Sequence, residues 1–369
     1  MFSKVKKNFG FGCMRLPVTN GEIDYEQFKK MIDLFISKGF NYFDTAHVYH
    51  SGLSEIALRE CLVKRYKRED FVLTNKLSGG CFKTAADIRP LLEEQLTACG
   101  VDYFDFYLMH AQSKLSYEHF KECHAYETAF KLKQEGKVKH VGISFHDTHE
   151  LLDEILTTYP EIEVVQLQIN YVDYDDVAVQ GKLCYEVCEK HHKPVIVMEP
   201  VKGGNLVNLP AKANKILSDL NNGSNASYAI RYAASFENVM MVLSGMSNLA
   251  QVEDNVSFME NFIPLNQKEY DAIDKVIAIF KSMNLIACTS CRYCIDGCPK
   301  KISIPDLFAC MNAKNIYSGF GTHVYYQIHT KGKGKASDCI KCGKCEIICP
   351  QHLKIRDLLI KVKEEFEKE

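Results

Sequence analysis

Two short cysteine runs near the C-terminus constrain this chain more than any other feature of its sequence. The chain has 369 residues and 16 cysteines. The runs are Cys288-x2-Cys291-x2-Cys294-x3-Cys298-Pro299 and Cys339-x2-Cys342-x2-Cys345-x3-Cys349-Pro350. Three closely spaced thiolates followed by a Cys-Pro form the ligand pattern of bacterial proteins that bind 4Fe–4S clusters. The runs therefore predict two cubane clusters.

In folds with two such clusters, the fourth cysteine of each run binds the cluster of the other run. We therefore assign one cluster to Cys288, Cys291, Cys294 and Cys349, and the other to Cys339, Cys342, Cys345 and Cys298. The residues after the fourth cysteines also match, because Cys298-Pro-Lys-Lys-Ile-Ser-Ile-Pro-Asp-Leu is echoed by Cys349-Pro-Gln-His-Leu-Lys-Ile-Arg-Asp-Leu. This repeat predicts a small ferredoxin-like domain of two similar halves, each with a cluster and a following helix. An added helix near Leu307–Ile316 is expected in the insert between the halves.

The alternative for these cysteines is structural zinc, since paired Cys-x2-Cys motifs also bind Zn²⁺ through four thiolates. Two runs of three cysteines, each closed by a Cys-Pro, fit zinc poorly, because a zinc site needs two pairs. Tetrahedral thiolate sites admit both metals, so an iron assay decides between them.

The region before the cysteine runs alternates short apolar runs with longer amphipathic stretches. The apolar runs are rich in Val, Ile, Phe, Tyr and Leu, and each is short enough to be a strand buried on both faces. They are Phe9–Met14, Gly39–Thr45, Phe71–Lys76, Phe104–His110, His140–Phe145, Val164–Asn170, Pro194–Pro200 and Val239–Gly245.

Eight strand–helix units predict a closed (β/α)8 TIM barrel with right-handed crossovers. The alternative is an open doubly wound sheet, but no Gly-x-Gly-x-x-Gly follows the first strand. A helix is expected over Gln267–Lys281, with Asn266 as its N-cap and Glu269 completing a capping box. The expected domains are therefore 1–284 for the barrel and 285–369 for the cluster domain.

Charge and composition set further limits. The net charge is only -2, which gives no reason to expect a nucleic-acid or membrane-surface partner. The basic start has no apolar stretch behind it, and no segment reaches the ~18 apolar residues of a membrane span. We expect a cytoplasmic protein, in which a disulfide scaffold is improbable because that compartment is reducing.

Four polar residues stand at or just beyond the ends of three successive predicted strands: Asp44, Tyr49, Lys76 and His110. Polar residues at the C-terminal ends of barrel strands are typical of catalytic sites. Taken singly, Lys76 could be a surface residue and His110 a satisfied core histidine. All four together are better explained by a catalytic site.

These residues resemble the aldo-keto reductase family. Asp44-Thr45-Ala46-x2-Tyr49-x2-Gly52-x-Ser54-Glu55 is similar to the family's signature after its second strand, and Gly10-Phe-Gly12-Cys-Met-Arg-Leu-Pro17 to its first strand. The resemblance extends from Phe9 to Asn255, and with its C-terminal runs the chain resembles the subgroup that has a double-cluster domain.

The resemblance implies an NAD(P)H-dependent oxidoreductase that reduces a small carbonyl compound. Tyr49 would donate the proton, and a nearby Lys76 ammonium is expected to lower the high pKa of the phenol. Asp44 would pair with Lys76, and His110 would orient the carbonyl oxygen.

The resemblance also implies where the cofactor lies. Ser144 and Gln166 would be near the nicotinamide carboxamide, Gly203, Gly204 and Leu206 near the pyrophosphate, and Ser244, Gly245, Met246 and Ser247 at the adenosine end, with Asp254 and Asn255 near the adenine.

Three departures from the family pattern matter. His146 stands where many members have an Asn, and it would take the contact that this Asn makes. Met198 replaces a tyrosine that stacks on the nicotinamide, and its thioether still packs on a ring. Gln251 stands where an arginine often grips the 2′-phosphate, so the preference for NADP over NAD is open.

Two functions compete. The complete tetrad favours a carbonyl reductase, in which the clusters transfer electrons or sense redox state, serving a redox partner protein or a bound flavin, although no flavin fingerprint is present. The alternative is an electron-transfer protein whose barrel is a cofactor-sensing or docking module. A third interpretation makes the clusters a structural cap. The substrate and the oligomeric state are not encoded in any motif found here.

Overall fold

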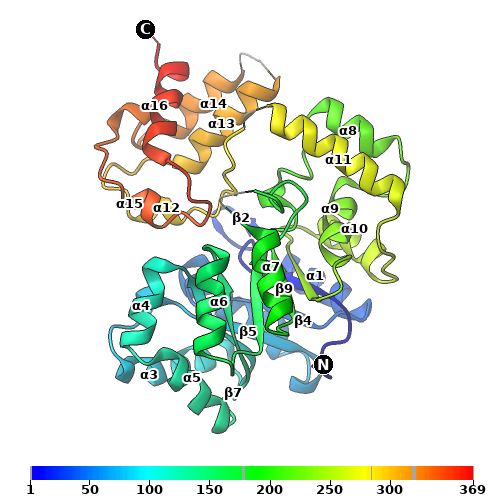
Figure 1. The fold of residues 1–369 in the computed structure, drawn as a ribbon, viewed down its shortest axis with the longest axis vertical. Coiled ribbons are helices and arrows are strands. Elements are labelled where there is room, and N and C mark those ends of the chain that lie inside the picture. The colour runs from blue at the N-terminus through cyan, green and yellow to red at the C-terminus, as the bar shows by residue number, and fades with distance from the viewer. Residues whose placement is uncertain (1, 177–178, 284, 318–320, 369) are drawn as a thin grey trace. The chain divides into compact units, whose positions relative to one another are not determined.

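The computed structural model describes residues 2–176, 179–283, 285–317 and 321–368 (Figure 1). The chain divides into two compact units. The barrel unit comprises Met1–Pro200 and Ala226–Asn266, and the cysteine unit comprises Val201–Asn225 and Gln267–Glu369. The division expected from sequence, 1–284 and 285–369, did not anticipate that Val201–Asn225 groups with the cysteine runs. Its boundary at residue 284 lies outside the described residues and stays a prediction.

The barrel unit contains a closed barrel of eight parallel strands, in the order β1-β10-β9-β8-β7-β6-β5-β4. This confirms the predicted (β/α)8 barrel, and every predicted apolar run supplies one strand. The strands are β1 (Phe9–Gly12), β4 (Tyr42–Asp44), β5 (Val72–Leu77), β6 (Phe104–Gln112), β7 (Val138–Phe145), β8 (Val164–Gln168), β9 (Val195–Met198) and β10 (Val239–Gly245). A two-stranded hairpin, β2 (Val18–Thr19) with β3 (Glu22–Ile23), was not predicted.

Helices follow the strands, as Figure 1 shows. Helix α1 (Tyr25–Ser37) begins where the Asp24 carboxylate accepts a hydrogen bond from the Gln27 N–H, and it buries Phe28 and Phe35 on one face. The other helices of this unit are α2 (Leu53–Leu58), α3 (Ala85–Cys99), α4 (Lys114–Glu122), α5 (Ala125–Gln134), α6 (His149–Thr158), α7 (Gly181–Lys190), α9 (Asn225–Ala234) and α10 (Leu249–Met259).

The interior of the barrel is filled below its C-terminal end. Tyr42, Phe106, Leu108 and Ile196 belong to one buried cluster there. Gly142 is required in this packing, because a Cβ at this position would lie 2.5 Å from Val164 Cγ2. Since side chains alternate along a strand, the next inward positions form a final layer above this core.

The cysteine unit contains two similar halves. Each has a short helix inside its cysteine run, α12 (Tyr293–Asp296) or α15 (Lys344–Ile347), and a longer helix after it, α13 (Ile304–Tyr317) or α16 (Ile355–Phe366). Leu307 and Phe308 of α13 share a buried cluster with Leu359 and Val362 of α16. The predicted repeat of two similar halves is therefore present.

The prediction of an added helix at Leu307–Ile316 was wrong in one respect. That stretch belongs to α13, which begins earlier, at Ile304, and is the counterpart of α16. The added helix is α14 (Gly321–Thr330), further along the insert. The remaining helices of the cysteine unit are α8 (Ala211–Ser218) and α11 (Gln267–Ser282). Among the helices that the structure describes, none combines the length and the apolar character needed to cross a bilayer.

Candidate active site and cluster sites

The last inward layer of the barrel is polar. Asp44 ends β4, and Lys76 and His110 lie near the ends of β5 and β6, at positions with the inward alternation of the core residues below them. Ser144 on β7 and Gln166 on β8 are directly paired in register and continue the same layer. The structure thus brings together, at one end of the barrel, residues that lie up to about 120 positions apart in the sequence.

Lys76 is the centre of this layer. Its side chain is fully buried, and its ammonium donates hydrogen bonds to Asp44 Oδ1 at 2.5 Å and to the Thr45 carbonyl at 2.8 Å. A third contact reaches the Tyr49 hydroxyl oxygen at 3.3 Å. Gln166 Nε2 donates to the other oxygen of Asp44 at 3.3 Å. A buried ammonium with several acceptors is held in one place by the protein alone.

Tyr49 enters the site from a tight turn. The turn covers Tyr49–Gly52, and both His50 and Ser51 adopt positive φ angles within it. Gly52 has a φ of 88° and precedes the first residue of α2, a backbone conformation that glycine adopts at the least cost. The ring of Tyr49 lies edge-on to that of His110, with centroids 5.9 Å apart. The turn therefore places the phenol between the lysine and the histidine.

His110 is oriented by a residue that the sequence did not single out. Ser78 Oγ and His110 Nδ1 share a hydrogen bond of 2.7 Å. Burial, together with the charges of Lys76 and His146, holds the pKa of His110 well below its ordinary value of 6.5. The imidazole is therefore neutral near pH 7.

The pKa of Tyr49 differs from the sequence-based expectation. Burial first, and then the charges of Asp44 and Glu199, raise the pKa of Tyr49 well above its ordinary value of 10. Lys76 was expected to lower the pKa of Tyr49, but burial has the larger effect, because it disfavours the charged phenolate. Burial likewise raises the pKa of Asp44, although Lys76 opposes the shift.

The strand that carries Lys76 is anchored by a buried amide network. Gln95 Nε2 donates to the Lys76 carbonyl at 2.9 Å, and Asn75 Oδ1 accepts from the Lys76 N–H at 2.8 Å. Tyr107 Oη donates to Gln95 Oε1 at 2.6 Å. These buried polar residues were missed, although an Asn inside an apolar strand was a possible signal.

Glu199 was also missed. It follows β9 with a φ of 56°, and its Oε2 is buried without a hydrogen-bond partner in the described structure. Its Oε1 lies 3.4 Å from the Arg15 guanidinium. Its charge reaches Tyr49, as the pKa of that phenol shows.

The predicted cofactor residues of the barrel unit fall into two groups. Ser144 Oγ accepts from the Ala111 N–H at 2.8 Å beside the tetrad, and Met198 ends β9. The second group surrounds the end of β10, where Asn255 Nδ2 donates to Ser244 Oγ at 3.0 Å and Gln251 Oε1 accepts from the Ser247 N–H at 2.7 Å. Gly245 and Met246 lie between these serines, the Met246 side chain is fully buried, and Asp254 precedes Asn255 on α10.

The remaining predicted cofactor residues belong to the cysteine unit. Gly204 has a φ of 97°, and no atom lies within 4 Å of the position that a Cβ would take. Open space beside a glycine is what the close approach of a phosphate requires. Leu206 is fully buried.

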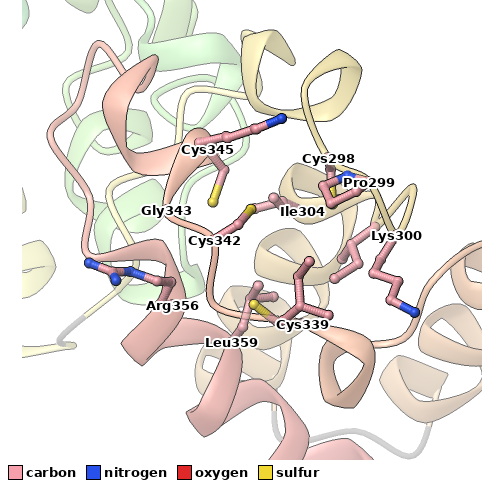
Figure 2. A pocket seen from close by; sticks show the side chains of 13 residues that line it. Cys298, Pro299, Lys300, Ile304, Cys339, Cys342, Gly343, Cys345, Arg356 and Leu359 are labelled. Atoms are coloured by element: carbon pink, nitrogen blue, oxygen red, sulfur yellow. The ribbon is translucent and has the colours of Figure 1, made fainter.

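The cysteines converge as the sequence predicted. Cys298, Cys339, Cys342 and Cys345 all line one small cavity, which Figure 2 shows. Burial, together with the charges of Glu346, Cys339 and Cys298, raises the pKa of Cys345 to about 11. Cys298 thus lies with the second run, not with its own.

The other set has the same crossed arrangement. Burial raises the pKa of Cys294, and the three thiols that add to the shift are Cys291, Cys288 and Cys349. The residues present therefore fit two cubane clusters with exchanged fourth ligands. In the described residues no group of three or more Cys, His, Asp or Glu side chains is arranged to hold a single metal ion.

Comparison with known proteins agrees with this geometry. The family model described as "Aldo/keto reductase family" matches residues 8–278, and the model described as "4Fe-4S dicluster domain" matches residues 287–353. Among relatives, the chain is 25% identical to prostaglandin F synthase 1 of Bos taurus over 273 residues, covering 66% of this chain and 82% of that one. It is 24% identical to the uncharacterized oxidoreductase YqkF of Bacillus subtilis, covering 72% and 90%.

Solved structures give the same fold. Aldo-keto reductase AKR11C1 from Bacillus halodurans, in its holo form, has a TM-score of 0.61 at 24% identity and covers 73% of this chain and 92% of its own. An aldo-keto reductase from Klebsiella pneumoniae, solved in complex with NADPH, has a TM-score of 0.61 at 19% identity and covers 74% and 95%. The chain therefore belongs to the aldo-keto reductase family, as an oxidoreductase whose reductase domain is followed in the sequence by a 4Fe–4S dicluster domain.

Proposed function

We propose that this protein reduces an aldehyde or ketone with NADPH or NADH, with Tyr49 as the proton donor. The observation that carries the proposal is the position of the Lys76 ammonium, 2.5 Å from Asp44 Oδ1 and 3.3 Å from the Tyr49 oxygen, in a fully buried side chain. The ammonium is thus fixed by Asp44 while it also contacts the phenol oxygen, where it can stabilise a phenolate.

Tyr49 and Lys76 have different roles in the proton transfer. The raised pKa of Tyr49 keeps the phenol protonated until a stronger base forms beside it, and the alkoxide produced by reduction is such a base. The Lys76 ammonium then stabilises the tyrosinate that remains. When bound, the reduced nicotinamide supplies the hydride.

His110 supplies orientation. Since its imidazole is neutral, it carries one ring proton. When Ser78 donates its hydroxyl proton to Nδ1, that ring proton is on Nε2 and is available to the carbonyl oxygen. A donor aimed at an oxygen that gains charge lowers the barrier more than it tightens binding.

The cofactor class is supported by the residues of the site. Ser144 and Gln166 share the layer with the tetrad, where their side chains can form hydrogen bonds with a carboxamide. The Klebsiella pneumoniae structure, solved with NADPH, has the same barrel. Gln251 offers no cation to a 2′-phosphate, so we expect a weak preference between NADPH and NADH.

The test is turnover of the anaerobically purified protein with NADPH or NADH and a panel of aldehydes and ketones. Tyr49→Phe is expected to lower the rate by about 10²–10⁴, the usual contribution of a general acid. Tyr25→Phe, at the start of α1, is the matched control. Unchanged turnover in Tyr49→Phe would contradict the proposal. Bleaching of the cluster absorbance by NADPH without carbonyl turnover would instead favour the electron-transfer alternative.

A further inference from the structure

The two halves of the cysteine unit differ at equivalent positions. The residue after the first cysteine of each run is Thr289 in one half and Ile340 in the other. Thr289 is 2% exposed, whereas Ile340 is 57% exposed. Because the repeats have the same cysteine spacing, this difference comes from what packs on each loop and not from the loops themselves.

The first loop is covered by another part of the same unit. Asn205 Nδ2 donates to the Cys288 carbonyl at 3.2 Å and to the Lys202 carbonyl at 2.9 Å. A Cβ on Gly203 would lie 2.3 Å from the Thr289 carbonyl oxygen, so the two backbones are in close contact. The segment Lys202–Asn205 thus shields the loop that begins the first run.

The second loop has no such cover among the described residues of its unit. Cys342 is an exposed cysteine, and Ile340 and Lys344 line the same cavity as the four thiols. Ile347 is 61% exposed and lies one helical turn after Lys344 on α15, so the two side chains share a face. Figure 2 shows Cys298, Cys339, Cys342 and Cys345 around this cavity, with Lys300 near them.

The charge around this opening is positive. Lys300, Lys301, Lys341 and Lys344 are all exposed, and in the described part of the chain none of them forms an ion pair. Arg356, which also lines the cavity, is neutralised by Glu346 at 2.7 Å. The parallel bridge between Ile302 and Gly334 brings the exposed Lys333 and Lys335 beside Lys301.

We propose that this surface, made of Ile340, Ile347 and the lysines 300, 301, 341 and 344, is the docking face for a small acidic protein that carries one electron at a time. The reduced carrier loses one electron and the cluster held by Cys298, Cys339, Cys342 and Cys345 gains it, with no proton or bond exchanged. The second cluster is thereby the entry point of the dicluster domain, and the first is the inner one.

The features of the face suit a short-lived redox encounter. Such complexes are small, below about 1,200 Å² of buried surface, and they are steered by opposite charges more than held by apolar contact. The two exposed isoleucines beside a cluster ligand can form an apolar contact with the partner. The lysines that form no ion pair attract an acidic partner to this face. The inference rests on the dicluster domain and does not depend on the carbonyl reductase proposal.

The test measures reduction of the cluster absorbance in the full-length protein by a reduced acidic ferredoxin, in a stopped-flow instrument without oxygen. For the wild type, the second-order rate is expected to fall steeply between low and high salt, because screening shortens the range of the steering. Lys341→Glu/Lys344→Glu is expected to lower the low-salt rate about tenfold or more, within the range that steering contributes. Reduction by dithionite should be unchanged.

Lys212→Glu/Lys268→Glu, on α8 and α11, makes the same change in net charge away from the cysteine runs and serves as the control. Three results would each overturn the proposal: an equal loss of rate in this control, a wild-type rate that does not change with salt, or no reduction of the clusters by the ferredoxin. So would binding to phosphatidylserine vesicles that the Lys341→Glu/Lys344→Glu variant loses, since the face would then be a membrane surface. Carbonyl turnover is not measured, so failure here leaves the reductase proposal standing.

Discussion

The C-terminal end of the barrel and the cysteine unit hold their reactive groups in place by different means. In the barrel, Lys76, Asp44 and Tyr49 are fixed by hydrogen bonds among themselves. In the cysteine unit, buried thiols are gathered around cavities, and they raise one another's pKa. In the first site, protein groups alone hold the reactive side chains in position. The second gathers groups that gain their main partners only when the inorganic core is bound.

The difference teaches where each site gets its stability. A barrel end is supported on all sides by strands, so an ion pair there is positioned by a scaffold that is already folded. The cysteine runs are mostly loops, and metal-binding free energy becomes folding free energy in such segments. The variants and treatments described next distinguish these two sources of stability.

Removal of the iron is expected to have the largest effect. Chelation under anaerobic conditions should unfold both cysteine runs, because their loops lose the core that joins them. Hydrogen exchange read by mass spectrometry should show lost protection across 286–303 and 336–353 and retained protection in β4–β6. Equal loss of protection in the barrel strands would remove the distinction between the two sites.

Lys76→Met is expected to cost about 3–5 kcal/mol of barrel stability, since it leaves the Asp44 carboxyl buried without its cation. Urea denaturation, followed by the loss of secondary structure in the barrel, measures this change in the free energy of unfolding. Adding Asp44→Asn should recover part of the loss, because the uncompensated group is then gone. Cluster content and cluster spectra should stay as in the wild type. A purely additive double variant would show that the pair is not coupled.

Gly203→Ala is expected to destabilise the cysteine unit by about 1–3 kcal/mol, because the residue has a φ of 64° and its Cβ would meet the Thr289 carbonyl. The electron paramagnetic resonance spectrum should change for the cluster held by Cys288 and not for the other. Gly204→Ala is the matched control, with a strained φ but open space around its Cβ. Identical spectra in the two variants would argue that backbone strain alone is responsible.

The smallest expected effect is a pH dependence of barrel stability from His110. Burial lowers its pKa in the folded protein, so below about pH 6.5 the unfolded chain binds more protons than the folded one. The free energy of unfolding should therefore rise with pH up to about 6.5, by at most ~1.4 kcal/mol per pH unit, and this part should be constant above it. His110→Gln should remove that slope. An unchanged slope would assign it to other groups.

The sequence determined much of this outcome through local patterns. Apolar runs of strand length, separated by amphipathic stretches, predicted all eight barrel strands, because burial on both faces requires that composition. The positions of Asp44, Lys76 and His110 at strand ends predicted their convergence, since the ends of parallel strands meet at one rim. The cysteine repeat predicted that Cys298 lies with the cysteines of the second run.

The tertiary structure alone decided the rest. The cover of Asn205 over Cys288, the exposure of Ile340, and the addition of Val201–Asn225 to the cysteine unit all join segments far apart in the chain. The raised pKa of Tyr49 is of the same kind, because burial outweighs the neighbouring ammonium. Spacing and periodicity report on a residue's own element, whereas desolvation and shielding depend on which distant segment packs against it.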